Sequence, residues 1–170
     1  LYSVPSLGRC DFENLILLDT GNPDLVAIAI GADTPGAPLF LYIGENDHTS
    51  DEFLTRNGLS PNQGKMFALI INNALNPENF YGTFNSRSGF FQEIAYYDSV
   101  LAGTQGYDSL GYASQALQYY LANEIGAFTF SRPEDLSLNP NNNREFVFTS
   151  TGRSSLFNGV DSWGTTYIIN

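Results

Sequence analysis

The residues best able to do chemistry lie in one short stretch, residues 130–135 (FSRPED), directly after the apolar run at residues 127–130. The stretch holds a cation, a proline and two carboxylates in consecutive positions. Pro133 fixes its own φ and favours extended backbone before it, so Arg132 and Glu134 are expected to point toward a shared place at the end of a strand. A carboxylate binds hard cations and an arginine fork matches phosphate, so a joint metal and anion site is one interpretation. An exposed turn with a local ion pair is the other.

The composition limits the kinds of partner and metal site. The chain has 170 residues, a net charge of −11 and only 7 Lys plus Arg, which argues against nucleic acid and anionic membrane surfaces and favours divalent cations. Cys10 and His48 are the single cysteine and histidine, which excludes an internal disulfide and a Cys/His zinc site. Any metal site must therefore use mainly oxygen ligands. No apolar run approaches the roughly 20 residues of a membrane-spanning helix.

Short strands are predicted over most of the chain. Apolar, β-branched or aromatic runs bounded by turn residues predict them at residues 12–20, 25–30, 38–44, 65–71, 90–97, 127–130, 144–151 and 163–169. One helix is predicted at residues 109–124, with Asp108 or Ser109 as its N-cap and Gly126 beyond its end. Because this helix interrupts the strands instead of alternating with them, the pattern predicts an all-β fold of antiparallel sheets with one helical insertion.

An acidic loop at residues 45–52 is a second place where a cation could bind. It has four carboxylates, but it lacks the glycine at the sixth position and the flanking helices of an EF-hand. We expect a solvated loop there, followed by a helical turn at residues 53–57.

Several segments, in order along the chain, resemble PhoX-type alkaline phosphatases. Residues 7–14 (LGRCDFEN) resemble the family's Gly-Arg-aromatic-x-His-Glu segment. Residues 31–33 with 39–44 (LFLYIG) are similar to its Gly-Asp-Asp … Tyr-Ile-Tyr hairpin. Residues 130–135 with 146–152 (FVFTSTG) are similar to its Arg-x-Glu-Gly … Thr-x-Gly blade.

Two further segments are similar to the cyanobacterial branch of that family, at residues 19–27 (DTGNPDLVA) and 163–169 (WGTTYII). With them the resemblance extends over essentially the whole chain. It implies a β-propeller of about six blades, of which residues 1–170 would form a partial domain of about two to three blades, incomplete at both ends. A periplasmic or extracellular location is implied as well.

The resemblance also implies an activity and a set of site residues. The activity is hydrolysis of a phosphate monoester at an oxygen-ligated centre of calcium, with iron as a further metal. Carried over by position, Glu13 and Glu134 match metal ligands, Asp33 is a further ligand candidate, and Arg132 matches the catalytic residue near the phosphate. The metals would polarise the phosphoryl group and Arg132 would stabilise its developing charge.

The chain departs from the family pattern near its start. Phe12 stands where the family has histidine, and Cys10 stands where it has an aromatic residue. The family's upstream motif, with a metal-bridging cysteine and further glutamates, does not occur in the sequence. This chain is therefore expected to be inactive alone. Since an open propeller segment leaves sheet edges uncovered, self-association or pairing with the rest of a parent chain is expected.

Two other functions stay open. One is a non-catalytic structural or binding module within a propeller, which the missing upstream motif favours. The other is a different calcium-dependent propeller hydrolase, such as a lactonase or a phytase. For Glu13, an exposed carboxylate at a sheet edge is an equal alternative to a metal ligand.

Overall fold

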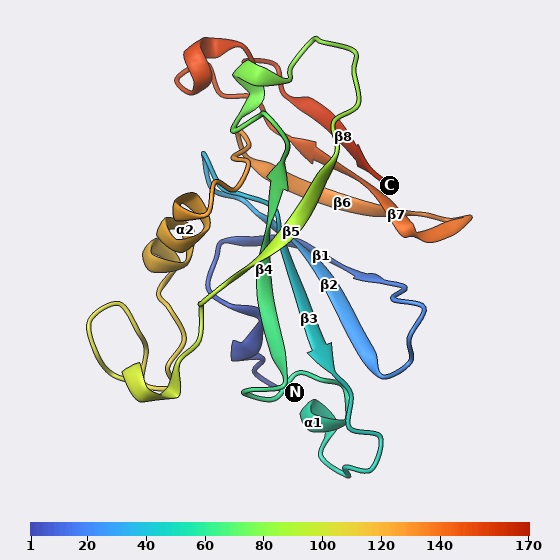
Figure 1. The fold of residues 1–170 in the computed structure, drawn as a ribbon, viewed down its shortest axis with the longest axis vertical. Helices are drawn as coiled ribbons and strands as arrows, with labels where there is room; N and C mark the ends of the chain where they lie inside the picture. The colour runs from blue at the N-terminus through green and yellow to red at the C-terminus, as the bar shows by residue number, and fades with distance from the viewer.

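The computed structural model describes all of residues 1–170, and its strands form two antiparallel sheets (Figure 1). The first sheet contains β1 (Phe12–Leu18), β2 (Leu25–Ala32), β3 (Phe40–Glu45), β4 (Gly64–Ile71) and β5 (Gly89–Ile94). The second contains β6 (Pro133–Asn139), β7 (Asn142–Ser150) and β8 (Thr165–Ile169). In both sheets the spatial order of the strands is their order in the chain, so each sheet is a meander. The prediction of an all-β fold of antiparallel sheets is confirmed.

The helical insertion lies between the two sheets in sequence, but it begins later than predicted. The helix α2 spans Gln115–Glu124, and its N-cap is Ser114, whose hydroxyl accepts a hydrogen bond from the Leu117 amide. Asp108 does not cap this helix, because its carboxylate accepts hydrogen bonds from the amides of Leu110 and Tyr112 and closes a turn. A second short helix, α1 (Phe53–Arg56), confirms the helical turn predicted there. Single 3-10 turns occur at Pro5–Leu7, Pro77–Asn79, Ser99–Leu101 and Phe157–Gly159.

The strand predicted at residues 127–130 does not form. The amides of Phe128 and Phe130 donate to the carbonyls of Leu69 and Ala37 outside any ladder. The only strand-like pairing of Thr129 is an isolated bridge to Pro38, and its amide donates to the Leu75 carbonyl. The apolar character of this run reflects burial of its two phenylalanines in the core, not a place in a sheet. Arg132 and Glu134 consequently lie where β6 begins rather than where a strand ends.

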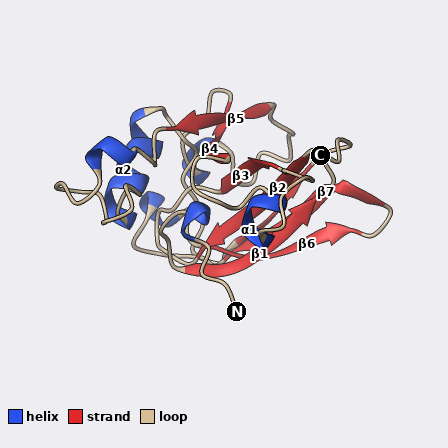
Figure 2. Cartoon of the chain, turned by 90° about the horizontal axis from the view of Figure 1, so that it is seen from below, coloured by secondary structure: helices blue, strands red, loops and turns tan.

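The core consists of two apolar clusters on opposite faces of the first sheet. One lies between this sheet and α2 and includes Ile30, Phe40, Tyr42, Met66 and Ala122. The other lies between the same sheet and the second sheet and includes Ala29, Leu39, Leu41, Phe128, Phe130, Phe148 and Tyr167. Figure 2 shows α2 at one end of the molecule and β6 and β7 toward the other. Because β2 and β3 are covered on both faces, their sequences are almost continuously apolar.

Close packing of β2 on β6 brings the two sheets together at the place where chemistry was predicted. A side-chain carbon added to Gly31 would lie 2.5 Å from the Glu134 carbonyl oxygen and 2.6 Å from the Leu136 side chain. Only glycine therefore allows this approach without displacing backbone. None of the helices is long and apolar enough to cross a membrane.

Candidate functional site

The backbone at the start of β6 is fixed by hydrogen bonds to the end of β7. The Arg132 amide donates to the Ser150 hydroxyl at 3.0 Å, and the Thr151 amide donates to the Arg132 carbonyl at 3.0 Å. Pro133 lies opposite Ser150 in the register of the two strands. Since side chains two residues apart in extended backbone lie on the same face, Arg132 and Glu134 emerge together.

Arg132 is held between two carboxylates from different parts of the chain. Its guanidinium forms ion pairs with Glu134, two residues on, and with Asp33, whose Oδ1 lies 2.7 Å from the arginine Nε. Asp33 follows β2, and its amide donates to the Asp11 carbonyl at 2.7 Å, which ties it to the residue just before β1. All three charged side chains are partly buried, with exposed fractions of 20–34%. The structure thus joins three of the four predicted site residues.

The charges of this group act on the pKa values of its members. Hydrogen bonding to Glu134 raises the pKa of Arg132 above its ordinary value, and the negative charges of Glu134, Asp33 and Glu13 add to this effect. Burial raises the pKa of Glu134, but hydrogen bonds from Thr151 and Arg132 and the positive charges of Arg132 and Arg153 outweigh it. The net result is a pKa of Glu134 below its ordinary value. Both Arg132 and Glu134 are therefore charged at neutral pH.

Glu13 lies at the edge of this group rather than inside it. It is an exposed residue of β1 that makes no ion pair. Its negative charge contributes to the raised pKa of Arg132 without a direct contact. The structure therefore places Glu13 near the predicted site and leaves it out of the contacts that Asp33 and Glu134 make.

The residues of this chain do not by themselves fit a calcium or iron site. No group of three or more His, Cys, Asp or Glu side chains is arranged to hold a metal ion. Asp33 and Glu134 share the Arg132 guanidinium, so a cation already compensates their charge. One buried acceptor remains: Asp33 Oδ1 has no aligned hydrogen-bond donor, because the Arg132 Nε–H points to Glu134. A single such oxygen is far from the six to eight that calcium takes.

Sequence reasoning missed the loop between β7 and β8, which contacts the residue next to Arg132 through Asp161. Asp161 is fully buried; its Oδ2 accepts a hydrogen bond from the Ser131 hydroxyl at 2.6 Å, and its Oδ1 accepts one from the Thr165 hydroxyl at 2.8 Å. Its carbonyl accepts a hydrogen bond from the Arg153 amide at 3.1 Å. No local pattern could have found Asp161, because Ser131 is 30 positions away in the chain.

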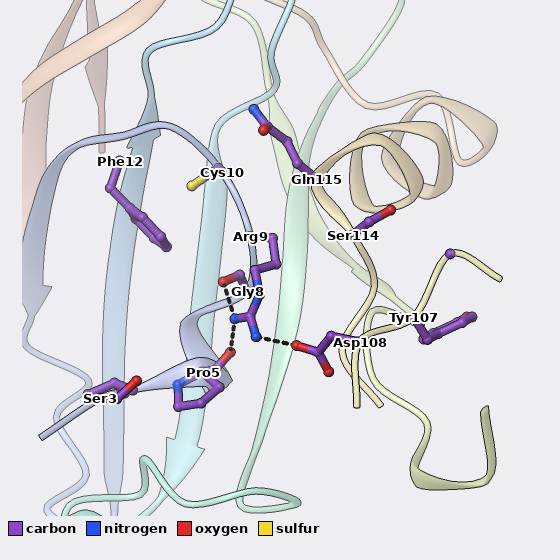
Figure 3. Close-up of a pocket in the computed structure, with 12 residues that line it drawn as sticks. Ser3, Pro5, Gly8, Arg9, Cys10, Phe12, Tyr107, Asp108, Ser114 and Gln115 are labelled. Atoms are coloured by element: carbon purple, nitrogen blue, oxygen red, sulfur yellow. Dashed lines mark hydrogen bonds and ion pairs between the residues drawn. The ribbon is translucent and has the colours of Figure 1, made fainter. Parts of the chain in front are cut away.

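A surface pocket of about 780 Å³ lies away from this site, between the N-terminal segment and the loop before α2 (Figure 3). Arg9 projects there, but its guanidinium donates to the carbonyls of Pro5 and Gly8 and pairs with Asp108. Burial, with the nearby charge of Asp11, raises the pKa of the Cys10 thiol to about 12, so no thiolate forms at neutral pH. This pocket offers neither a free cation nor a reactive nucleophile.

Together, the two meander sheets and the arginine held by carboxylates define an all-β protein of the propeller type with a candidate oxyanion site. Its structure is similar to that of Pseudomonas fluorescens PhoX in complex with vanadate, a transition state analogue, with a TM-score of 0.62 and 14% sequence identity. The superposition covers 97% of this chain and 29% of the PhoX chain, so this chain spans less than a third of that protein. At this identity the likeness concerns the fold alone. No protein-family model and no curated protein sequence matches the chain.

Proposed function

We propose that the chain is part of a PhoX-like phosphatase that hydrolyses phosphate monoesters, and that it is inactive alone. The observation that carries this proposal is Arg132, partly buried between Asp33 and Glu134, within a fold similar to part of a vanadate-bound PhoX. Vanadate is an oxyanion that reproduces the geometry of a transferring phosphoryl group, and transition-state analogues mark the chemistry that a site favours. A guanidinium is the side chain best suited to such an oxyanion.

In the proposed reaction, Arg132 binds the non-bridging oxygens of the phosphoryl group and stabilises the charge that develops on them. Asp33 and Glu134 hold the guanidinium in one orientation, so that less conformational freedom is lost when the ester binds. The calcium and iron implied by the sequence resemblance would supply Lewis-acid chemistry. Glu13, Asp33 and Glu134 are their proposed ligands from this chain, and residues outside 1–170 would have to complete the set.

Further parts of the proposal rest on sequence resemblance. Residues 19–27 and 163–169 favour the cyanobacterial branch of PhoX-like proteins, and the resemblance favours a periplasmic or extracellular location. Residues 1–170 are proposed to form a partial propeller domain. The proposed partners are the phosphate ester, a second copy of the chain and the rest of a parent chain, with no nucleic acid.

The test is hydrolysis of a chromogenic phosphate monoester in the presence of calcium, measured with this chain and with the parent chain from its source. We expect turnover and bound metal in the parent and neither in residues 1–170 alone. A parent protein that has neither turnover nor bound metal would show that the proposed function is wrong.

A non-catalytic binding module is the second candidate function. The observation that favours it is the missing group of three or more metal-binding side chains in residues 1–170. A module of this kind would bind orthophosphate without hydrolysing any ester, also in the parent chain. A different calcium-dependent propeller hydrolase would instead hydrolyse a lactone or phytate and leave the simple monoester intact.

A further inference from the structure

The two arginines at the start of β6 and the end of β7 differ in how their charges are used. Arg132 contacts both Asp33 and Glu134, whereas the guanidinium of Arg153 makes no ion pair and no hydrogen bond with any residue. The two guanidinium groups lie near the carboxylates of Asp33 and Glu134, with Glu13 at the edge of the group. Only Arg132 is in contact with any of these carboxylates. Arg153 is therefore the cation of this group that has no counter-ion in contact.

Burial makes this lack of a partner costly. Arg153 is half-buried: the protein shields its Nε from solvent without offering an acceptor, so a ligand can reach only the terminal Nη1 and Nη2 groups, which make no hydrogen bond with the chain either. A guanidinium has five N–H donors in a fixed planar fork, and a buried donor without an acceptor destabilises the folded state. Such a group gains most from a ligand whose oxygens match the fork, which are those of a phosphate or a carboxylate.

A backbone hydrogen bond brings the segment that carries Arg153 next to the segment that carries Arg132. Arg153 follows Thr151 by two residues, and the Thr151 amide donates to the Arg132 carbonyl at 3.0 Å. The charge of Arg153 also acts on Glu134, where it contributes to the lowered pKa. Buried Asp161 connects the two arginine segments, since its carbonyl accepts from the Arg153 amide and its carboxylate accepts from Ser131, the residue before Arg132.

We propose that Arg153 is a second oxyanion-binding residue of this site, whose guanidinium binds the oxygens of phosphate or of a phosphate monoester beside Arg132. The choice of phosphate over other oxyanions rests on the proposed function. Arg132 supplies positive charge from a position fixed by its carboxylates, and Arg153 supplies the hydrogen-bond donors that the protein leaves unused.

Titration of the 170-residue chain with orthophosphate tests the proposal, with sulfate and acetate at equal ionic strength as competing oxyanions. Calorimetry or phosphorus NMR measures the dissociation constant. We expect Arg153→Gln to weaken phosphate binding at least about tenfold, because a hydrogen bond to a charged group is lost. The matched control is Arg144→Gln, since Arg144 is an exposed arginine of β7 without an ion pair. Its substitution should leave the dissociation constant unchanged.

Equal phosphate affinity of Arg153→Gln and the wild-type chain would overturn the proposal, and so would an absence of phosphate binding by the wild-type chain. Circular dichroism checks that the variant is folded. If Arg153→Gln is not folded, Arg153→Lys is measured instead, because lysine keeps the positive charge and lacks the planar N–H fork of the guanidinium. Weaker phosphate binding by Arg153→Lys than by the wild-type chain supports the proposal, and equal binding overturns it.

The outcomes also separate this proposal from the proposed function. If phosphate binding depends on Arg153 but the parent protein hydrolyses no ester, the role of Arg153 is supported and the proposed phosphatase function is wrong. If the parent protein hydrolyses the ester and Arg153→Gln leaves this hydrolysis unchanged, the phosphatase function is supported and the proposed role of Arg153 is wrong.

Discussion

Arg132 owes its orientation to two carboxylates that reach it by different routes. Glu134 is a local partner, placed on the same face by extended backbone, while Asp33 arrives from the other sheet. Exposed ion pairs contribute little to stability because solvent screens them and their side chains lose conformational freedom. The side chains of this group are 20–34% exposed. We therefore expect the two carboxylates to contribute mainly to the orientation of the guanidinium and less to the free energy of unfolding.

The first residue-scale prediction concerns catalysis. Glu134→Gln in the parent protein should lower kcat/KM for a phosphate monoester about a hundredfold, because Arg132 loses its charged partner and a proposed metal ligand disappears. Steady-state kinetics measures the effect. Glu93→Gln is the matched control, since Glu93 forms an exposed pair with Lys65 on the first sheet. Near-normal turnover of Glu134→Gln would contradict the assigned role.

The second residue-scale prediction concerns acid stability. The pKa of Glu134 in the folded chain lies below its ordinary value of 4.5. The stabilisation from its ionised form is therefore fully present above about pH 4.5 and is lost as the pH falls through the lowered pKa. The difference in melting temperature between the wild-type chain and Glu134→Gln should be largest at neutral pH and should shrink below pH 4.5. A difference that is constant with pH, or that grows on acidification, would show that the lowered pKa of Glu134 is wrong.

At the scale of elements, α2 shows what local pattern can and cannot find. Leu117 and Leu121 share a helical face and correctly predicted a helix in this region. The same spacing continued back to Leu110 and placed the start six residues too early, because Asp108 and Ser109 resemble an N-cap. In the structure the Asp108 carboxylate accepts hydrogen bonds from the Leu110 amide of its own turn and from the Arg9 guanidinium. It is therefore not available as an N-cap, and the helix begins only after Ser114.

The element-scale prediction compares the two candidate caps. Ser114→Ala should lower the free energy of unfolding by about 1 kcal/mol, because the hydroxyl that accepts from the Leu117 amide is lost. Ser109→Ala should change it by less than about 0.5 kcal/mol, as expected for an exposed side chain without such a role. Urea denaturation measures both values. Equal effects, or a larger effect at Ser109, would contradict the observed start of the helix.

At the scale of the whole molecule, each sheet has an outer strand without a partner on one side, β5 in the first sheet and β8 in the second. Both strands carry apolar side chains that the chain does not cover: Phe90 on β5 is 51% exposed and Ile168 on β8 is 75% exposed. An apolar groove of about 270 Å³ lies between these two strands. Open edges with apolar side chains favour association with another strand, in keeping with the proposed self-association.

The prediction at this scale is that the wild-type chain self-associates in a concentration-dependent way and that Phe90→Lys weakens this association. A lysine on an edge strand opposes pairing because its charge would have to be desolvated. Sedimentation velocity measures the oligomeric state. Val100→Lys, at an 85% exposed position away from both strands, should have no effect. A wild-type chain that stays monomeric at all concentrations would show that the prediction is wrong.

The sequence by itself determined the features that depend on near neighbours. Apolar runs and turn residues predicted every strand of the first sheet and β7 and β8 of the second, and the spacing around Leu117 predicted one helix, because these patterns reflect which side chains a strand or helix buries. They did not predict β6 (Pro133–Asn139), whose sequence is largely polar and begins with proline. The contact between Arg132 and Glu134 was also predictable, since only Pro133 separates them.

The tertiary structure alone decided the rest. The run at residues 127–130 is as apolar as a strand, and only the packing of Phe128 and Phe130 into the core shows that it pairs with no sheet. Asp33 reaches Arg132 only because Gly31 lets β2 pack directly on β6, and Asp161 reaches Ser131 only through the loop between β7 and β8. Contacts of this kind join residues far apart in the chain, and no local periodicity records them, because they depend on how two complete sheets fit together.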